Sequence, residues 1–532
     1  MGTLWYNGKI YTMENEGHRV EAVLTVDGQI LAVGKKHDLM ERYKSYIDEE
    51  IDLKNKTMLP GFQDSHMHLI GFGESLLRMD LSNIRSKGEL LHAVKMKKEE
   101  LGDGEWIIGE GWNENLWEER VIPTKEELDE VAPSNPVLLK RTCRHVCLVN
   151  SKTLRLARVS EDTANPEGGI IDRDENGKLT GLLKDAAMNL VANVVPPYTL
   201  ETIKRSLRKG IQECYKLGIT GAHTEDLSYY GSFTNTYKAF QEVIEKEDLY
   251  FRAHLLIHHE VIDEWAQLGV DYLSGTPFIT FGPMKIFADG SLGGRTALLS
   301  FLYADDTSTN GVNVHSYEKF QALVKKARSL NLPVAVHAIG DLAFEWLLDA
   351  IEKYPVNVGR DRLIHAQLLR KDLVERMKKL PVVVDIQPRF LHSDFPWVFE
   401  RIGHGPIDYL YAWKTLINEG IHCAGGSDAP IEPADPLLGI HAAVLRTIPD
   451  DENQQVYIPE ERLSMYEAVS LFTKGSAYAA LEERKFGMIK EDFAADFTIL
   501  DQDLFEIDPK DILNTRVEIT VVNGKIMYER KS

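Results

Sequence analysis

Cysteine is scarce in this chain, which has four cysteines among 532 residues and none in a CxxC pair. So few cysteines in so long a chain do not build a disulfide framework. Cys143 and Cys147 stand beside His145, a spacing that leaves a zinc site open. A fourth ligand and a loop-type context are missing there, and buried thiols are common without a function, so a structural role is favoured.

Long apolar runs are also absent: no stretch approaches the ~20 residues that a membrane helix requires. The start, MGTLWYNGKIYTM, lacks the basic segment and apolar stretch of a secretory signal, so we expect a cytoplasmic protein. Positive charge is in deficit, with 61 Lys and Arg against 82 Asp and Glu and a net charge of −21. Because phosphate binding draws on clustered Lys and Arg, we expect no nucleic-acid partner, and no membrane partner either.

The two ends of the chain carry strong hairpin signals. Asn7-Gly8, Asp27-Gly28 and Asn523-Gly524 each stand between β-branched or aromatic residues, and such pairs accept the positive φ values of a type I′ turn. FAADFTILD adds a further strand pattern near the C-terminus. We therefore expect residues 1–57 and 485–532 to share one small β domain.

Between the ends, apolar strand-like runs alternate with amphipathic helical stretches, which is typical of βα units and a parallel sheet. There are eight such runs: 58–68, 218–226, 251–258, 283–291, 332–340, 362–367, 382–388 and 421–429. Eight is the strand number of a (β/α)₈ barrel, whose active site lies at the carboxyl ends of its strands. We predict this α/β barrel over 58–484. The gap 69–217 is too long for one helix, so we expect an inserted α+β subdomain at about 102–195.

Metal-capable side chains stand at the ends of several of these runs. His66 and His68 form an HxH pair, and residues i and i+2 of a strand point to the same side, so both imidazoles can bind one cation. His337, His365 and Asp428 end three further runs. For any single histidine a hydrogen-bonded core role is the safer interpretation. The set together favours a divalent metal site, since imidazole and carboxylate suit zinc and similar ions.

Two further residues admit two interpretations each. Lys285 lies on an otherwise apolar run, and a carbamylated lysine would supply a carboxylate that bridges two metals. Alternatively its stem packs and its ammonium meets Asp289 or a solvent channel. Asp428, in GGSDAP, can bind metal, accept a proton from water and deliver it to a leaving amine, or it can cap the next helix.

At this point the chain resembles the amidohydrolase superfamily over nearly its whole length. The segments LPGFQDSHMH, KIFADGSLGGRTA, VAVHAIGD, GGSDAPIEPADPLLGI and ADFTILD are similar to the YtcJ-like or amidohydrolase-3 group. The resemblance implies a (β/α)₈ TIM-like barrel, a small β-sandwich domain built from both termini and an insertion after the first barrel strand. It also implies one or two divalent metal ions, most often zinc. The residues that would hold them are His66, His68, Lys285, His337, His365 and Asp428. Asp428 would act catalytically, and His365 would ligate metal or polarise the substrate oxygen.

The implied activity is hydrolysis of a non-peptide C–N bond in a small amide-type molecule by hydroxide at the metal, with Lys285 carbamylated if two ions bind. A mononuclear deaminase of a heterocycle is the nearest alternative, and a non-catalytic metal-binding or regulatory barrel is the alternative from another class. We expect a homodimer. The candidates to line the substrate pocket are Trp112, Asn113, Trp117, Asp289, Ser291 and Arg389, each of which can equally have a packing role. Arg389 can pair with a substrate carboxylate or merely with a neighbouring acid such as Asp394.

Overall fold

The computed structural model describes residues 2–141, 145–166, 168–449, 451 and 453–531, and the chain divides into two compact units. The larger unit comprises Met1–Gly73 and Thr199–Ser532, and the smaller one comprises Glu74–Tyr198. The inserted subdomain predicted at about 102–195 lies within this smaller unit.

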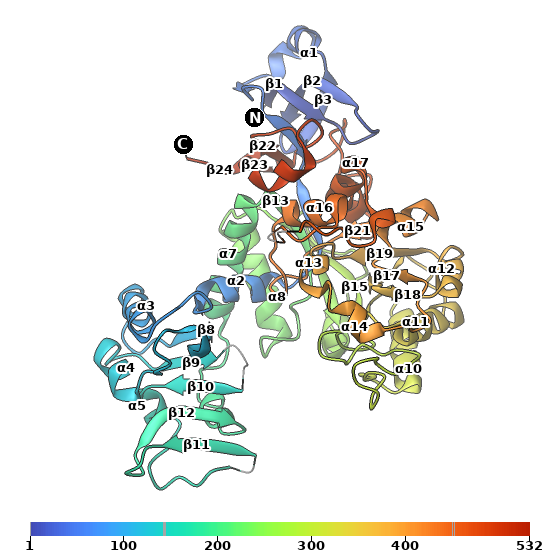
Figure 1. The fold of residues 1–532 in the computed structure, drawn as a ribbon. Coiled ribbons are helices and arrows are strands. Elements are labelled where there is room, and N and C mark those ends of the chain that lie inside the picture. Colours follow the sequence, from blue (N-terminus) through green and yellow to red (C-terminus); the bar gives the residue numbers. More distant parts are fainter. Residues whose placement is uncertain (1, 142–144, 167, 450, 452, 532) are drawn as a thin grey trace. The chain divides into compact units, whose positions relative to one another are not determined.

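The centre of the larger unit is an eight-stranded parallel sheet, as predicted (Figure 1). Each of the eight predicted runs overlaps one of its strands. In sheet order these are β6 (Phe62–Met67), β13 (Ile219–Thr224), β14 (Arg252–His258), β15 (Ile279–Phe287), β16 (Val334–Ala338), β17 (Asp361–His365), β19 (Val382–Ile386) and β21 (Cys423–Gly425). Strands such as β14 are buried along their whole length, which is what a sheet covered on both faces requires.

The segment after β21 brings the last strand against the first. The amide of Asp428 donates to the carbonyl of His66 at 2.7 Å, and the amide of His68 donates to the carbonyl of Ala429 at 2.8 Å. The sheet is thereby nearly closed into a TIM-like barrel. Contacts across its interior support this: Arg362 on β17 pairs with Asp385 and also donates to the carbonyl of Ser65 on β6, although β17 and β6 are not neighbours in the sheet.

Helices follow most of the barrel strands. They are α2 (Leu69–Leu77), α7 (Leu200–Lys216), α8 (Phe233–Gln241), α9 (Ile262–Ala266), α10 (Tyr317–Ser329), α11 (Asp341–Lys353), α12 (Lys371–Met377), α13 (Phe390–Asp394), α14 (Val398–Ile402), α15 (Trp413–Asn418), α16 (Pro436–Leu445), α17 (Met465–Ser470) and α18 (Ser476–Ala479). Figure 1 shows α10, α11 and α12 on the outside of strands β15 to β19. The short strands β18 (Leu368–Leu369) and β20 (Tyr409–Leu410) pair with each other.

Helix α7 shows why these segments become barrel helices. Thr199 caps its start by accepting a hydrogen bond from the amide of Thr202. Its buried residues Ile203, Leu207 and Ile211 are spaced by four, so they form one apolar stripe that packs into the main hydrophobic core.

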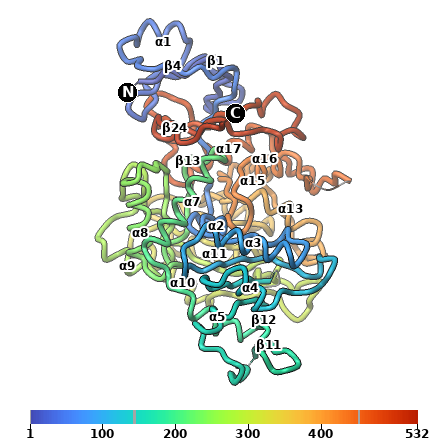
Figure 2. The backbone as a smooth tube through the Cα atoms, turned by 90° about the vertical axis from the view of Figure 1, so that its left-hand side faces the viewer, coloured from blue at the N-terminus to red at the C-terminus, as the bar shows by residue number. Residues whose placement is uncertain are grey.

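Strands from both ends of the chain build one mixed β-sheet, which confirms the expectation of a β domain shared by the termini. Its order is β24 (Lys525–Glu529), β23 (Val517–Val522), β22 (Phe497–Leu500), β5 (Thr57–Pro60), β1 (Gly2–Tyr11), β2 (Arg19–Val26) and β3 (Gln29–Gly34), with β4 (Glu49–Asp52) beside β1 and α1 (Lys36–Arg42) after β3. Figure 2 shows the N- and C-terminal segments together in this part of the unit.

The hairpin predictions met different outcomes. Asp27-Gly28 and Asn523-Gly524 have positive φ at both residues and connect β2 to β3 and β23 to β24, as predicted. The prediction of a hairpin at Asn7-Gly8 is wrong. Asn7 has φ 58°, but β1 continues through it, and the register with β2 shifts between Tyr6 and Ile10. The pair therefore forms an irregularity within one strand. A Cβ at Gly8 would collide with Leu53 and with the carbonyl oxygen of Lys56, so this position requires glycine.

The smaller unit has its own α+β fold. Its six strands are β7 (Met79–Asp80), β8 (Ile107–Trp112), β9 (Val137–Arg141), β10 (Val146–Val149), β11 (Gly169–Arg173) and β12 (Leu179–Asp185), and its helices include α3 (Lys87–Glu100), α4 (Lys125–Val131), α5 (Ser151–Leu156) and α6 (Met188–Ala192). Across the described residues of both units, every helix is too short or too polar to cross a lipid bilayer.

Candidate metal centre

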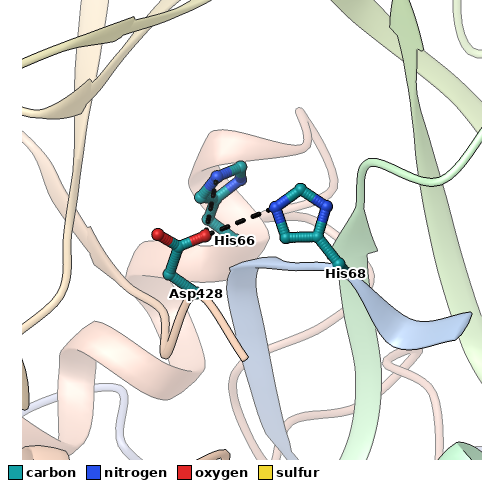
Figure 3. Close-up of side chains that lie close together, drawn as sticks. All are labelled: His66, His68 and Asp428. Carbon is teal, nitrogen blue, oxygen red and sulfur yellow. Dashed lines mark ion pairs between the residues drawn. The ribbon is translucent and has the colours of Figure 1, made fainter. Parts of the chain in front are cut away.

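Three predicted ligands meet at the carboxyl end of the barrel. His66 and His68 come from the end of β6, and Asp428 follows β21. One carboxylate oxygen, Asp428 Oδ1, lies 3.5 Å from Nε2 of His66 and 3.5 Å from Nε2 of His68. Figure 3 shows the carboxylate facing both imidazoles. The potential ligand atoms of these three residues all lie within 4.8 Å of one another, which is the geometry of a group that can hold one cation.

The local chain is built for this approach. A Cβ at Gly426 would lie 2.6 Å from the backbone nitrogen of His66, so only glycine lets the two segments come this close. Asp64 ties them together, because its carboxylate accepts hydrogen bonds from the amides of both His66 and Ser427. Asp428 itself has φ 60°, a left-handed conformation that Asp tolerates better than most residues.

Lys285 on β15 reaches the same centre across the barrel. Its side chain is fully buried, and Nζ lies 3.2 Å from Nε2 of His66. Burial lowers the pKa of Lys285, although the carboxylates of Glu225 and Asp428 oppose this shift. Asp289, the alternative partner considered from the sequence, accepts instead from the amides of Leu298, Ile339 and Gly340.

His337 and His365 lie beside each other, with ring centroids 4.4 Å apart, and His365 lies 5.9 Å from the ring of His66. Nε2 of His337 lies 2.9 Å from the carbonyl of Gly290, so as a donor there it leaves Nδ1 free to ligate. Both ring nitrogens of the buried His365 lack a hydrogen-bond partner among the described residues. Unsatisfied imidazole nitrogens beside His66 fit the donor set of a second divalent ion.

Glu225, a residue that sequence reasoning did not single out, completes the surroundings of His68. It follows β13, is fully buried, and its backbone carbonyl lies 2.8 Å from Nδ1 of His68. Its Oε2 accepts from the hydroxyl of Tyr229 at 2.5 Å and lies 3.8 Å from the same imidazole nitrogen. Burial raises the pKa of Glu225 to about 7 against the opposing charges of Lys285 and His68. The signal was the acid pair that ends GAHTED, at the end of the second predicted run.

The electrostatics of His68 and Asp428 fit a cation. Burial alone would lower the pKa of His68, but its hydrogen bond with Asp428 and the charges of Glu225 and Asp428 raise it to about 9. Burial would raise the pKa of Asp428, but the same hydrogen bond and the charges of His365, His68 and Lys285 lower it. Buried carboxylates therefore already stabilise positive charge where two imidazoles converge, and imidazole with carboxylate suits zinc and related ions.

The candidates for the substrate pocket lie in different settings. Trp112 and Trp117 are in the core of the smaller unit, and their indole nitrogens donate to the carbonyls of Leu139 and Ile84. Asn113 in the same unit accepts hydrogen bonds from the amide of Asn115 and from Arg141. Substrate contact by these three side chains stays a prediction.

The other candidates belong to the larger unit. Asp289 holds three backbone amides, as described above, and Ser291 Oγ accepts from the amide of Gly294. Both side chains thus organise the loop after β15. Arg389 lies 3.5 Å from Glu432. Asp394, its alternative partner from the sequence, accepts from Tyr411 and Gln367 instead.

The possible zinc site at Cys143 and Cys147 is only partly visible. Cys143 lies outside the described residues. Cys147 is buried, and Nδ1 of His145 lies 3.1 Å from the carboxylate of Asp185.

Comparison with known proteins identifies the family of the chain. The profile of the amidohydrolase family matches residues 49–528. The Bacillus subtilis (strain 168) protein named "Putative amidohydrolase YtcJ" is 50% identical over 531 residues, which is 100% of this chain and 100% of that protein. N-substituted formamide deformylase from Arthrobacter pascens is 25% identical over 545 residues, covering 98% of each chain. Among solved structures, an uncharacterized metal-dependent hydrolase from Pyrococcus furiosus is 32% identical with a TM-score of 0.80, over 95% of this chain and 100% of that one.

These matches confirm the resemblance drawn from the sequence motifs. They extend over the barrel and the terminal β-sheet, so they do not depend on the HxH pair alone. With a family profile over most of its length and a full-length relative at 50% identity, the chain belongs to the amidohydrolase family.

Proposed function

We propose that this protein is a metal-dependent hydrolase that cleaves a non-peptide C–N bond of a small amide-type molecule. Zinc is the divalent metal that we expect. The observation that carries the proposal is the convergence of His66, His68 and Asp428, whose ligand atoms lie within 4.8 Å of one another at the carboxyl end of the barrel. This is the end at which barrel enzymes place their active sites.

A divalent cation bound to these three residues would supply Lewis-acid chemistry, since it lowers the pKa of water and polarises a carbonyl group. Asp428 is the acid–base group in our proposal. Its carboxylate lies within reach of both imidazoles, so it can take a proton from the attacking water and deliver it to the leaving nitrogen. His68 is held for ligation through Nε2, because its Nδ1 is engaged by the carbonyl of Glu225.

Lys285 decides whether one or two ions bind. Unmodified, its ammonium would compete with a cation for His66, whose Nε2 is 3.2 Å away. Carbamylated, it would add a carboxylate to a set of donors that His66, His337 and His365 would complete for a second ion. The unsatisfied nitrogens of His365 support the binuclear form.

The amide class of substrate is supported by a relative. The Arthrobacter pascens protein that shares 25% identity over nearly the full chain is named an N-substituted formamide deformylase, a name that describes cleavage of an amide C–N bond. We extend that bond type, and not that particular substrate, to this chain.

The test is metal content by elemental analysis together with amine release from a panel of N-substituted amides and heterocyclic amines. We expect about two equivalents of metal, amine release from the amides, loss of one equivalent in Lys285→Ala, and a rate lower by about 10²- to 10⁴-fold in Asp428→Asn. His18→Ala, which changes an exposed histidine just before β2, is the matched control and should change neither quantity. Release of ammonia from heterocycles alone would replace the proposal by deamination, and absence of metal after resupply would refute it.

A further inference from the structure

Buried hydrogen-bonding groups without partners gather near the carboxyl end of β19. Among the described residues no partner is found for buried nitrogens Nε and Nη1 of Arg389, for both ring nitrogens of His392, for Nδ1 of His441 or for the hydroxyl of Thr447. His392 and His441 are 9% and 4% exposed, and their rings are 5.5 Å apart. Buried polar groups are nearly always satisfied, and each of these side chains carries at least one N–H or O–H, so together they point to a missing acceptor.

These residues come from two neighbouring segments. Arg389 stands just before α13 and His392 lies in that helix. His441 lies in α16, and Thr447 follows just beyond its end. Both Figure 1 and Figure 2 draw α13 beside α16. The backbone of Thr447 lies beside the His392 ring, and Arg389 is close enough to lower the pKa of both histidines. We call Arg389, His392, His441 and Thr447 the donor cluster.

The donor cluster adjoins the metal centre. Phe390, the residue after Arg389, lies with its ring 6.0 Å from the ring of His365. On the other side, Glu432 stands four residues after Asp428 in the same loop, and its Oε2 lies 3.5 Å from Nε of Arg389. A ligand held by the cluster would therefore extend toward His365 and Asp428.

The charge of the cluster is a single guanidinium. Burial, with the charge of Arg389, lowers the pKa of His392 to about 3 and that of His441 to about 4, so both rings are neutral near pH 7. Glu432 is the nearby acid, but its approach to Nε is an ion pair without hydrogen-bond geometry. The Arg389 side chain is 22% exposed, so it is open to a ligand while two of its nitrogens are shielded from water.

We propose that the donor cluster binds a carboxylate of the substrate, with Arg389 as its main contact, so that the preferred substrates are amides that carry a free carboxylate, such as N-acyl amino acids. A planar carboxylate matches the two-pronged geometry of a guanidinium. The neutral imidazoles of His392 and His441 and the hydroxyl of Thr447 would surround the bound carboxylate without adding charge. This inference rests on the proposed function only for the identity of the substrate as an amide.

The test uses matched pairs of probes: N-acetylglycine and N-acetylphenylalanine against the same compounds as carboxamides. Binding to the zinc-reconstituted protein is measured by calorimetry, and amine release is followed on the same compounds. We expect each carboxylate to bind at least about tenfold more tightly than its carboxamide, the effect of a charge-assisted hydrogen bond. Arg389→Met should remove the preference, and Arg389→Lys should keep part of it.

Glu432→Gln gives the sharpest check, because its expected effect has the opposite sign. Removing the competing carboxylate should strengthen carboxylate binding severalfold and leave carboxamide binding unchanged. If Arg389 serves only to pair with Glu432, this variant gains nothing. Arg376→Met is the matched control and should behave as the wild type, since Arg376 on α12 pairs with Asp349 and Glu352 on α11.

The outcomes separate the two proposals. A carboxylate preference that depends on Arg389 supports the donor cluster even if no amide is cleaved, in which case the proposed function alone fails. Equal binding within each pair, or a preference that survives Arg389→Met, overturns the carboxylate site whether or not the amides are hydrolysed. Thermal unfolding of each variant shows that the fold is retained, and the Glu432→Gln arm decides the question if Arg389→Met does not fold.

Discussion

His68 owes its orientation mainly to a backbone group. The carbonyl of Glu225 lies 2.8 Å from Nδ1, and no side-chain substitution removes that contact. The carboxylate of the same residue lies 3.8 Å from Nδ1 and is itself held by Tyr229. Glu225 therefore acts on the metal centre in two ways, by fixing the tautomer of His68 and by adding a negative charge behind it.

Glu225→Gln separates these two contributions, since it keeps the backbone carbonyl and the side-chain volume but removes the charge. Loss of a carboxylate behind a ligating histidine typically weakens metal binding by about 10- to 100-fold. We expect an effect at the lower end of this range, because the backbone contact remains, and competition with a chromophoric chelator measures it. Glu482→Gln changes a partly buried acid outside the centre and serves as control. Equal affinity in the two variants would show that the charge of Glu225 does not matter.

The convergence of three candidate ligands is the part of the site that follows most directly from the sequence. His66, His68 and Asp428 stand at strand ends in patterns that follow directly from the two-residue period of a strand, and the structure brings them together. The partner of Arg389 was not predictable. Asp394 is close to it in sequence, yet Tyr411 and Gln367 from elsewhere in the chain take that carboxylate. Such competition between distant residues leaves no trace in local spacing.

At the scale of elements, the loop from Gly425 to Pro430 joins the last barrel strand to the first. Its amides bond to Asp64 and to the carbonyl of His66, so the loop both closes the barrel and positions Asp428. A change in this loop should therefore affect stability and metal binding together.

Gly426→Ala tests this coupling. The added Cβ would lie 2.6 Å from the backbone nitrogen of His66 and 2.9 Å from Asp64 Oδ1, so the loop or β6 must shift. We expect a loss of about 1–3 kcal/mol in the free energy of unfolding and weaker metal binding. Gly88→Ala, at a helical position in α3 with only Ser86 Oγ at 3.9 Å, is the control that should lose neither. Normal metal binding in a destabilised Gly426→Ala protein would argue against the coupling.

Element prediction was most successful where one pattern decides the structure. The eight barrel strands are apolar runs buried on both faces, and all eight were found from sequence. Asn7-Gly8 was misjudged because the same dipeptide suits a turn and a strand irregularity, and only the pairing of β1 with β2 and β5 distinguishes them. The start of the smaller unit at Glu74 falls inside helix α2, where no break in composition marks a boundary.

At the scale of the larger unit, one buried ion pair connects the barrel to the terminal β-sheet. Arg252 on β14 binds both carboxylate oxygens of Asp496, just before β22, at 2.9 and 3.1 Å, and both side chains are less than a tenth exposed. Asp496 also accepts from the amide of Asn523 in the last hairpin. The pair thus joins segments from the middle and the end of the chain.

Arg252→Leu should leave Asp496 buried without its counter-charge. Breaking a buried pair in this way costs about 3–5 kcal/mol of the free energy of unfolding. Urea unfolding measures the loss. The control is Arg376→Leu, which breaks more exposed ion pairs between α12 and α11 and should change the free energy of unfolding by no more than about 1 kcal/mol. Similar losses in the two variants would mean that the barrel and the terminal sheet do not depend on this contact.

A bound metal should stabilise the barrel as a whole, because its ligands come from the first and the last barrel strands, at His66, His68 and Asp428. An ion that binds only the folded chain adds stability that grows with its concentration, reaching about 4 kcal/mol at 1,000 times its dissociation constant. We therefore expect a chelator to lower the thermal unfolding midpoint and zinc to restore it. In Asp428→Asn the response to chelator and zinc should largely vanish, because the connection between β6 and the segment after β21 loses a ligand. In Arg252→Leu the response should persist from a lower starting midpoint, because that substitution weakens the contact with the terminal sheet and leaves the metal ligands in place. A midpoint insensitive to zinc in the unaltered protein would show that the two strands are held together by the hydrogen bonds of the Gly425–Pro430 loop alone.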